Sequence, residues 1–434
     1  MTTRLRLELI EQLPLAAWTK GFSADDQELK LGDIASRGWN LLDGQLPLPL
    51  ATLRESALRR NSAWMRAYVA ATGARLCPHG KTTMAPQLFQ RQLDDGAWGL
   101  TAATAGHVRT YRHFGVPRIL LANQLVEPAG IAYVLAELAR DPDFDFYCLV
   151  DSEVGAQRLA AAVRASGLAR PLQVLIEVGA PQGRAGVRGV EQGLALARRL
   201  QALAPALALR GIECYEGIFG GPPEQQPPRI AELLSDSRAL LQACGAEQLF
   251  APGTVLLSAG GSAYFDLVAR DYAGLIDPAV QLILRSGCYL SHDSGFYARA
   301  LQDIRGRGLQ PALTELPAPV PALQVWAAVQ SLPEPGLMVA GFGKRDVSHD
   351  LDLPVLEAWY RPGLHARPVP VASGRLLRLY DQHACIAVPE DAAYEVGDLI
   401  AVGVSHPCTT FDKWPLLALI DDDYRVLEGI RTFF

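Results

Sequence analysis

The chain has 434 residues, of which 49% are hydrophobic and 20% are charged, so it can bury a large core as two or three domains or as a barrel with an added module. Its formal net charge of −6 argues against a protein that binds the phosphate backbone of nucleic acid, because such a protein needs a basic face. The N-terminal stretch lacks the pattern of a secretory signal, and no run approaches the length of a membrane-spanning helix. We therefore expect a cytoplasmic protein that binds neither nucleic acid nor membrane, and in that compartment its seven cysteines should be free thiols.

Between about residues 70 and 290, short β-like runs alternate with Ala- and Leu-rich stretches of helical period, as is typical of repeated βα units. The expected strands are residues 74–78, 98–102, 118–122, 145–150, 173–178, 211–215, 254–258 and 281–284. Helical patterns cover residues 128–141, 152–167 and 193–206, and a further helix should begin near Pro86. Eight such strands predict an α/β fold with a (β/α)8 barrel, whose strand-to-helix loops form the mouth where active sites lie.

The Pro-rich stretch at residues 315–324 marks an expected domain boundary. Beyond it, β-branched and aromatic runs separated by turns predict an antiparallel β domain. We place the barrel at residues 36–310 and the C-terminal β domain at residues 311–434, completed by residues 1–35.

Lys81 falls on the predicted loop after the first barrel strand, in the run "CPHGKTT". A lone lysine is usually a solvated surface cation. However, a lysine held on a rigid strand end, with His79 and two threonines beside it, can form a Schiff base, and this chemistry is typical of pyridoxal 5′-phosphate (PLP). We therefore treat Lys81 as a candidate catalytic residue.

A glycine-rich turn, "SAGGSAYFD", follows the seventh expected strand. Glycines allow backbone N–H groups to approach a phosphate closely, and hydroxyls add donors. In barrels, the loops after strands seven and eight often bind phosphate. The candidate phosphate-binding residues are Ser258, Gly260, Gly261 and Ser262.

His406 and Cys408 are separated by one residue near the C-terminus. Residues i and i+2 of a strand point to the same face, so the imidazole and the thiolate could converge on one metal ion. A nitrogen and sulfur donor pair favours zinc, and an ion with two protein ligands keeps positions open for water or substrate.

Other candidates lie near predicted strand ends. Arg184 could face a cofactor ring or form a surface ion pair, and Tyr215 and Glu216 could be a packing residue and a helix cap. His383 could be a histidine satisfied within the β domain.

Together these segments resemble the D-serine dehydratase and D-threonine aldolase family of fold type III (alanine racemase-like) PLP enzymes. "CPHGKT" is similar to the family's R-P-H-x-K-T motif, which implies a Schiff-base lysine at Lys81 and a catalytic histidine at His79. "EVGAPQGRAG" is similar to the family's E-I-D-x-G-x-x-R-x-G motif and carries Glu177, Arg184 and Gly186.

Four later segments extend the resemblance over roughly residues 40–420. "SAGGS" is similar to the family's phosphate motif, and "RSGCY" is similar to its R-x-G-x-Y segment, with Arg285, Gly287 and Tyr289. His406 and Cys408 match its H-x-C metal motif, and "KRDVSHD" at residues 344–350 is similar to a K-x-x-S-x-D segment. The resemblance implies that Tyr215, Gly287 and Tyr289 also bind the cofactor.

Four positions depart from the family pattern. Cys77 replaces an arginine, Thr83 and Met84 replace a His-Lys pair, and Gly179 replaces an aspartate. These departures concern the substrate more than the cofactor.

The resemblance implies a PLP- and zinc-dependent lyase that dehydrates a D-3-hydroxy amino acid, such as D-serine or D-threonine, to a 2-oxo acid and ammonia. The alternative is a D-threonine aldolase that leaves glycine and an aldehyde, although aldolases of the family tend to carry a carboxylate where this chain has Cys408. A metal-free racemase, a non-catalytic PLP carrier and a barrel with a purely structural Lys81 are further readings. A homodimer is implied by the resemblance.

Overall fold

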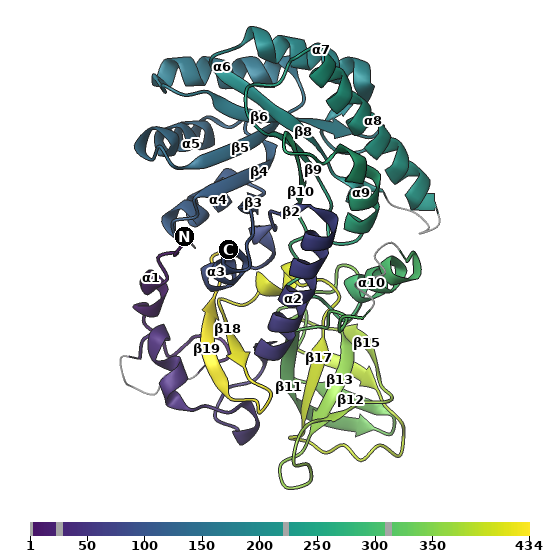
Figure 1. The fold of residues 1–434 in the computed structure, drawn as a ribbon. Coiled ribbons are helices and arrows are strands. Elements are labelled where there is room, and N and C mark those ends of the chain that lie inside the picture. Colours follow the sequence, from purple (N-terminus) through teal and green to yellow (C-terminus); the bar gives the residue numbers. More distant parts are fainter. Residues whose placement is uncertain (1–2, 23–28, 220–224, 309–314) are drawn as a thin grey trace.

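The computed structural model describes residues 3–22, 29–219, 225–308 and 315–434. Figure 1 shows two sheets, one surrounded by helices and one formed mainly by C-terminal strands. The first has nine parallel strands, of which β7 Val187–Arg188 pairs with β6 and the other eight follow the path β2-β10-β9-β8-β6-β5-β4-β3. Their bounds are β2 Arg75–Leu76, β3 Leu100–Ala102, β4 Arg118–Gln124, β5 Asp145–Val150, β6 Leu172–Gly179, β8 Leu207–Cys214, β9 Val255–Ala259 and β10 Val280–Leu284. Each lies at one of the eight predicted positions.

Backbone hydrogen bonds join the two ends of this path. Trp98 N–H donates to Leu76 O at 2.7 Å and Thr101 N–H donates to Pro78 O at 2.9 Å, and an isolated parallel bridge pairs His79 with Thr101. The interior is filled by apolar side chains from successive strands: Cys77, Leu120, Tyr147, Leu149, Leu175, Leu256 and Ile283. The predicted α/β barrel is confirmed.

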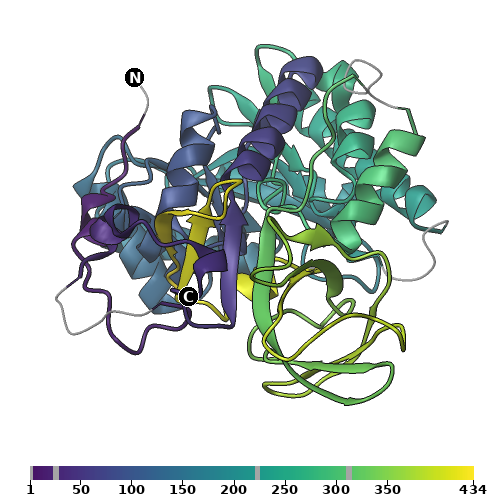
Figure 2. The same cartoon turned by 90° about the horizontal axis from the view of Figure 1, so that it is seen from below.

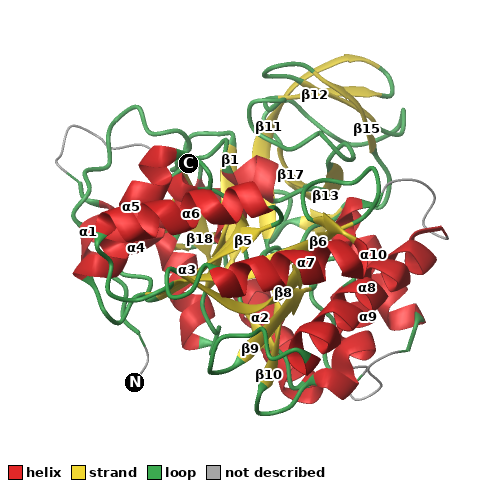
Figure 3. Cartoon of the chain, turned by 90° about the horizontal axis from the view of Figure 1, so that it is seen from above, coloured by secondary structure: helices red, strands yellow, loops and turns green. Residues whose placement is uncertain are grey.

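Helices cover the outside of the parallel sheet, as the view from above shows (Figure 3). They are α2 Glu55–Thr72, α3 Pro86–Asp94, α4 Ala105–His113, α5 Pro128–Arg140, α6 Glu153–Ser166, α7 Gly189–Ala202, α8 Gln226–Ala246, α9 Phe265–Tyr272 and α10 Phe296–Gly306. Pro86 and Pro128 stand in the first turns of their helices, where the missing N–H leaves no bond unmade. This agrees with the predicted helix starts.

The second sheet follows the path β14-β13-β17-β11-β1-β18-β19, and β12, β15 and β16 branch from it. Its strands are β1 Leu50–Arg54, β11 Leu323–Glu334, β12 Leu337–Ala340, β13 Val355–Tyr360, β14 Val369–Pro370, β15 Arg375–Leu379, β16 Ala384–Ala387, β17 Leu399–Gly403, β18 Leu416–Ile420 and β19 Val426–Arg431. All pairs are antiparallel except β1 with β18. An antiparallel β domain is therefore present, with one parallel pair.

The N-terminal contribution to this sheet differs from the prediction. Strand β1 lies within the range expected for the barrel, yet it pairs with β11 on one side and β18 on the other. Residues 3–22 and 29–35 provide no strand of the sheet. Instead Ile10, Leu15, Leu31 and Ile34 pack in one apolar cluster with residues of β18 and β19, beside which the N-terminal segment lies in Figure 2.

The expected boundary between residues 310 and 311 lies outside the described residues, so the two domain ranges stay a prediction. All seven cysteines are free thiols. Within the described part of the chain, no helix combines the length and the apolarity needed to cross a membrane.

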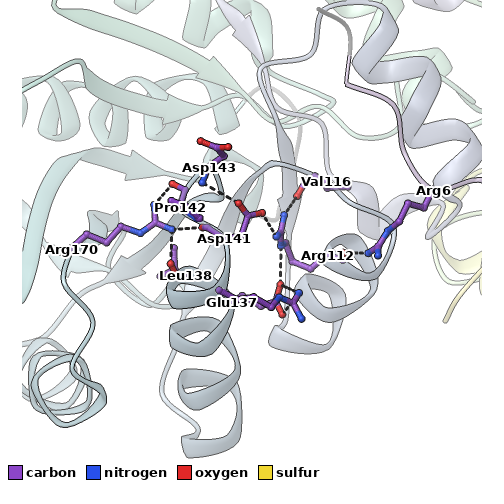
Figure 4. A network of polar contacts seen from close by, with 10 residues as sticks. Arg6, Arg112, Val116, Glu137, Leu138, Asp141, Pro142, Asp143 and Arg170 are labelled. Atoms are coloured by element: carbon purple, nitrogen blue, oxygen red, sulfur yellow. Dashed lines mark hydrogen bonds and ion pairs between the residues drawn. The ribbon is translucent and has the colours of Figure 1, made fainter.

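An ion-pair network fastens α4 to α5 on the outside of the barrel (Figure 4). The buried guanidinium of Arg112 donates to Glu137 at 3.1 Å and to Asp141 at 2.5 Å. It also donates to Val116 O at 2.8 Å, and the carbonyl of Arg112 accepts from Arg6 at 2.8 Å. The network thereby attaches the N-terminal segment to the barrel.

Candidate active site

A cavity of ≈ 350 Å³ lies where the barrel mouth meets the β domain. Lys81, Arg184 and Arg285 line it from the barrel, and His406 and Cys408 line it from the segment after β17. Lys81 and His406 are 325 residues apart in the sequence (406 − 81). The fold nevertheless brings the lysine motif and the H-x-C motif to the same cavity.

Lys81 sits in the short 3-10 helix η3 (Gly80–Thr82), between β2 and α3. Gly287, at the end of β10, approaches this segment so closely that a Cβ there would lie 2.6 Å from Thr82 Oγ1 and 2.7 Å from His79 Cβ. Only glycine fits at such a distance. This contact holds the lysine loop against the neighbouring strand end.

The His79 side chain lies beside Lys81, and its Nδ1 is buried with no hydrogen-bond partner among the described residues. Burial, followed by the positive charge of Lys81, holds the pKa of His79 well below its usual value of 6.5. The imidazole is therefore neutral at pH 7. A buried polar atom without a partner indicates a site built for a group that supplies one.

Arg184 projects from the loop between β6 and β7 (Val187–Arg188), and its Cζ lies 4.8 Å from the centroid of the Tyr215 ring. Burial raises the pKa of the Tyr215 hydroxyl to about 12, so the phenol keeps its proton. Arg184 and Tyr215 both line the cavity.

The glycine-rich turn follows β9 as predicted, but Glu216 already uses its amides. The carboxylate of Glu216 accepts from Gly260 N–H at 3.0 Å and from Gly261 N–H at 2.5 Å, and Glu216 is fully buried. A Cβ at Gly261 would lie 2.8 Å from Tyr215 Cε2, which explains the glycine. The helix-cap interpretation of Glu216 is therefore wrong, because its side chain turns inward to the glycine loop.

The two serines of the turn have different surroundings. Ser258 is buried, and its Oγ accepts from Arg285 Nη1 at 2.7 Å. Ser262 lines the cavity. Its Oγ accepts a hydrogen bond from the Cys288 N–H at 3.4 Å. Of the predicted phosphate ligands, Gly261 and Ser262 line this cavity, whereas Ser258 supports Arg285.

Buried ionisable side chains also line the cavity, and sequence reasoning missed one of them, Glu213. Arg285 Nη2 lies 2.5 Å from Glu213 Oε1, and both side chains are almost fully buried. Glu177, on the neighbouring strand, accepts from Gln124 Nε2. Burial raises the pKa of Glu213 to about 8 and also raises that of Glu177. Only the family motifs singled out Glu177 and Arg285, and no motif singled out Glu213.

His406 and Cys408 do converge, but not on a strand. Strand β17 ends at Gly403, His406 lies in the following loop, and Cys408 begins the short helix α11 (Cys408–Phe411) with Pro407 at its N-cap. The proposed i, i+2 strand geometry is therefore wrong, because the chain turns at the proline. A hydrogen bond between the two side chains raises the pKa of His406 to about 9.

Asp350 and Cys288 complete the surroundings of this pair. His406 Nδ1 lies 2.5 Å from Asp350 Oδ2, and Cys408 Sγ lies 3.6 Å from Cys288 Sγ. Asp350 is the last residue of the "KRDVSHD" segment, which was its only signal in the sequence. Among residues 3–22, 29–219, 225–308 and 315–434, no group of three or more His, Cys, Asp or Glu side chains is arranged to hold a metal ion.

Tyr289 is not brought to this cavity. It lines an adjoining cavity of ≈ 30 Å³, together with Ser286 and His292, and burial raises the pKa of its hydroxyl. Gly287 remains at the cavity as predicted.

The departures from the family pattern have structural reasons at two positions. A side chain at Gly179 would collide with Ala185 O and with the Arg188 guanidinium. Arg188 donates to Ala185 O at 3.1 Å and to Gly186 O at 2.6 Å, so it supports the loop of Arg184. Cys77 is buried and burial raises its pKa to about 12, which makes it an inert thiol. Thr83 and Met84 are also buried.

Comparison with known proteins finds relatives in sequence. The family model of the putative serine dehydratase domain matches residues 322–420. D-threonine aldolase from Arthrobacter sp. is 25% identical over 87% of this chain and 88% of its own. D-threo-3-hydroxyaspartate dehydratase from Delftia sp. (strain HT23) is 32% identical over 35% of this chain and 39% of its own.

The fold has solved counterparts. The crystal structure of D-threonine aldolase from Filomicrobium marinum aligns with a TM-score of 0.72 at 24% identity, covering 91% of this chain and 97% of that one. An Ala racemase-like protein from Idiomarina loihiensis aligns with a TM-score of 0.69 at 17% identity, covering 91% and 99%.

A barrel with a lysine at its mouth, joined to an antiparallel β domain, is the alanine racemase-like fold. In sequence, the chain is similar to the D-serine dehydratase and D-threonine aldolase family of that fold. It is accordingly a PLP-dependent lyase.

Proposed function

We propose that this protein dehydrates a D-3-hydroxy amino acid, such as D-serine or D-threonine, to a 2-oxo acid and ammonia, using PLP and zinc. The observation that carries the proposal is that Lys81 lines the same cavity as His406 and Cys408. A Schiff-base lysine and a nitrogen and sulfur donor pair in one site suit a reaction that breaks a Cα–H bond and a Cβ–O bond of the same substrate.

The residues of the cavity fit PLP. His79 Nδ1 and Glu213 Oε2 are buried without a partner in the described part of the chain, as expected of a site that receives a polar ring. Lys81 would hold the aldehyde carbon through a Schiff base, Arg184 and Tyr215 would contact the ring, and Ser262 would contact the phosphate. When bound, PLP supplies a sink for the electrons left on Cα.

The donor pair fits zinc. Because Asp350 takes Nδ1 of His406, Nε2 is the ring nitrogen left to bind a metal, in the carboxylate–histidine–metal arrangement. The thiolate of Cys408 adds a soft ligand, which zinc accepts and magnesium does not. Zinc would supply a Lewis acid for the β-hydroxyl, which is otherwise a poor leaving group.

The chain's own groups then have distinct tasks. Freed when the amino group of the substrate takes its place, Lys81 Nζ would be the base that takes the α-proton of the substrate. Neutral His79 lets this amine lie beside it without the repulsion of a second cation. The loop of His406 and the helix α11 close the barrel mouth from the β domain, which limits the access of water.

Retro-aldol cleavage of a D-3-hydroxy amino acid to glycine and an aldehyde is the second candidate. It is favoured by the similarity to D-threonine aldolase, which covers 87% of this chain. The two reactions share Lys81 and the metal pair. They differ in whether the substrate loses its Cβ–O bond or its Cα–Cβ bond.

Incubation with D-threonine separates the two. We expect 2-oxobutyrate and ammonia, detected by chromatography, from a dehydratase. Glycine and acetaldehyde as the only products would transfer the assignment to the aldolase.

Three variants test the cofactor and the metal. Lys81→Ala should lack the visible band of the lysine–PLP Schiff base that borohydride abolishes in the wild type. His406→Ala and Cys408→Ala should each lose zinc by elemental analysis and lose dehydration. Unchanged zinc and activity in both would refute the Lewis-acid role.

We further propose that the enzyme is a homodimer, as is common in this fold type. Light scattering during size-exclusion chromatography of the PLP-loaded protein should give twice the monomer mass of 46.9 kDa. A mass of one chain would contradict this.

A further inference from the structure

Glu213, in strand β8, is one of the residues that line the cavity. Strand β8 places it in register with Glu177 on β6 and with Ser258 on β9. Residues in register on neighbouring parallel strands point to the same side of the sheet, so the three side chains form a row near the carboxyl ends of the strands. Glu213 is 2% exposed and lines the cavity.

The two oxygens of Glu213 have different environments. Oε1 lies 2.5 Å from Arg285 Nη2, whereas Oε2 is buried and has no hydrogen-bond donor among the described residues. Leaving a buried acceptor unpaired costs about 1–3 kcal/mol. The site therefore lacks a donor at Oε2.

The other two buried carboxyls at the cavity differ from Glu213 in this respect. Glu177 accepts from Gln124 Nε2, and Glu216 accepts from two backbone amides. Neither of them has an oxygen that is buried and unpaired. Of these three carboxyls, Glu213 is thus the one with an oxygen left without a hydrogen-bond donor.

The ligand proposed for this cavity carries one such donor. The ring nitrogen of PLP lies opposite the ring carbon that bears the aldehyde, so it points away from the lysine that holds the aldehyde. When protonated, it is an N–H donor with a positive charge, which suits a carboxylate oxygen.

The charges around Glu213 allow it to supply the proton. Arg285, Arg184, Glu177 and Glu216 face it from the adjoining segments, and burial raises its pKa to about 8. At pH 7 the free carboxyl thus holds a proton. Transfer of that proton from Oε2 to the ring nitrogen leaves a carboxylate between a pyridinium and the Arg285 guanidinium, with no other change in bonds.

We propose that Glu213 is a cofactor-binding residue that keeps the PLP ring nitrogen protonated through Oε2. This rests on the proposed function, because it requires PLP in the cavity. A protonated ring withdraws electrons from Cα more strongly than a neutral one. The arrangement would therefore strengthen the electron sink at the step in which Lys81 removes the α-proton.

Nitrogen-15 NMR of the holoenzyme, loaded with PLP labelled at the ring nitrogen, tests this. In the wild type at pH 7 the resonance should lie at the position of a pyridinium. In Glu213→Gln it should move to the position of a neutral pyridine. Glu177→Gln is the matched control: it removes the same charge from the adjacent strand, and we expect the pyridinium resonance to persist.

The outcomes distinguish the two proposals. A wild-type protein that forms no Schiff-base band with PLP overturns the proposed function. A wild type that forms the band but shows a neutral-pyridine resonance overturns the role of Glu213 alone, whether or not the variant folds. An unchanged pyridinium resonance in Glu213→Gln, with native circular dichroism, also overturns it.

Discussion

His406 Nδ1 and Asp350 Oδ2 lie 2.5 Å apart, and they come from two segments of the β domain that are separated by 56 residues. Asp350 also accepts from Thr409 Oγ1 at 2.8 Å, so its carboxylate is fixed on both sides. The imidazole orientation is therefore set before any ion binds.

This relationship predicts an effect of Asp350→Asn on metal affinity. Loss of the carboxylate removes the group that orients the imidazole, and such outer partners are typically worth 10- to 100-fold in metal affinity. We expect zinc affinity, measured by competition with a chromophoric chelator, to fall by about that factor. Asp352→Asn is the control, since Asp352 pairs with Arg299 instead. Equal affinities in the two variants would contradict the role of Asp350.

We expect substitution of Glu216 to change the affinity for PLP. Its carboxylate accepts hydrogen bonds from the Gly260 and Gly261 amides. A phosphate, which is also negatively charged, would use the same two donors. Glu216→Gln should therefore tighten PLP binding by about tenfold, or roughly 1.4 kcal/mol, as measured by the Schiff-base absorbance at increasing PLP. Weaker binding would mean that the carboxylate supports the glycine loop and that the phosphate binds elsewhere.

His79 predicts a pH dependence of stability in the PLP-free protein. Its folded pKa is held well below 6.5 by burial and by Lys81, so below about pH 6.5 the unfolded chain binds more protons than the folded one. The free energy of unfolding should then fall as pH decreases, by up to about 1.4 kcal/mol per pH unit for this one group. His79→Asn should show a shallower fall in urea titrations between about pH 7.5 and 5.

The control for His79 is His113→Asn, because His113 is exposed at the end of α4. His107 and His292 also have pKa values lowered by burial, so some slope should persist in both variants. If His79→Asn and His113→Asn give the same slope, the burial argument for His79 is wrong.

We expect substitution of Arg112, which lies away from the cavity, to lower the stability of the protein. Arg112→Met leaves the buried Glu137 carboxylate without its buried partner, and breaking such a pair typically costs about 3 kcal/mol or more. Arg140→Met removes an exposed partner of the same carboxylate and should cost under about 1 kcal/mol. Chemical denaturation of both variants measures the difference. Similar losses of stability in the two variants would show that burial of the Arg112–Glu137 ion pair does not increase its contribution to the free energy of unfolding.

The sequence allowed the eight barrel strands to be predicted because each is a short apolar run between segments of helical period. The pairing of strand β1 was not predicted. Its partners, β11 and β18, lie about 270 and 365 residues away in the sequence, and no local pattern encodes such pairing. Likewise Lys81, Arg184 and the H-x-C pair were found from motifs.

Pairings between side chains could not be found in the same way. Glu213, Glu216 and Asp350 acquire their roles only through contacts with Arg285, the glycine loop and His406, respectively. We also expected His406 and Cys408 to lie on a strand, whereas the chain turns at Pro407 and Cys408 begins a short helix.

The central position of β1 in the second sheet has a consequence for biosynthesis. A ribosome releases Leu50–Arg54 early, but the strand cannot find β11 or β18 until more than 260 further residues have emerged. The β domain is consequently a structure that closes last, and a fragment of residues 315–434 expressed alone would have a gap between β11 and β18 where two strand edges remain exposed to self-association.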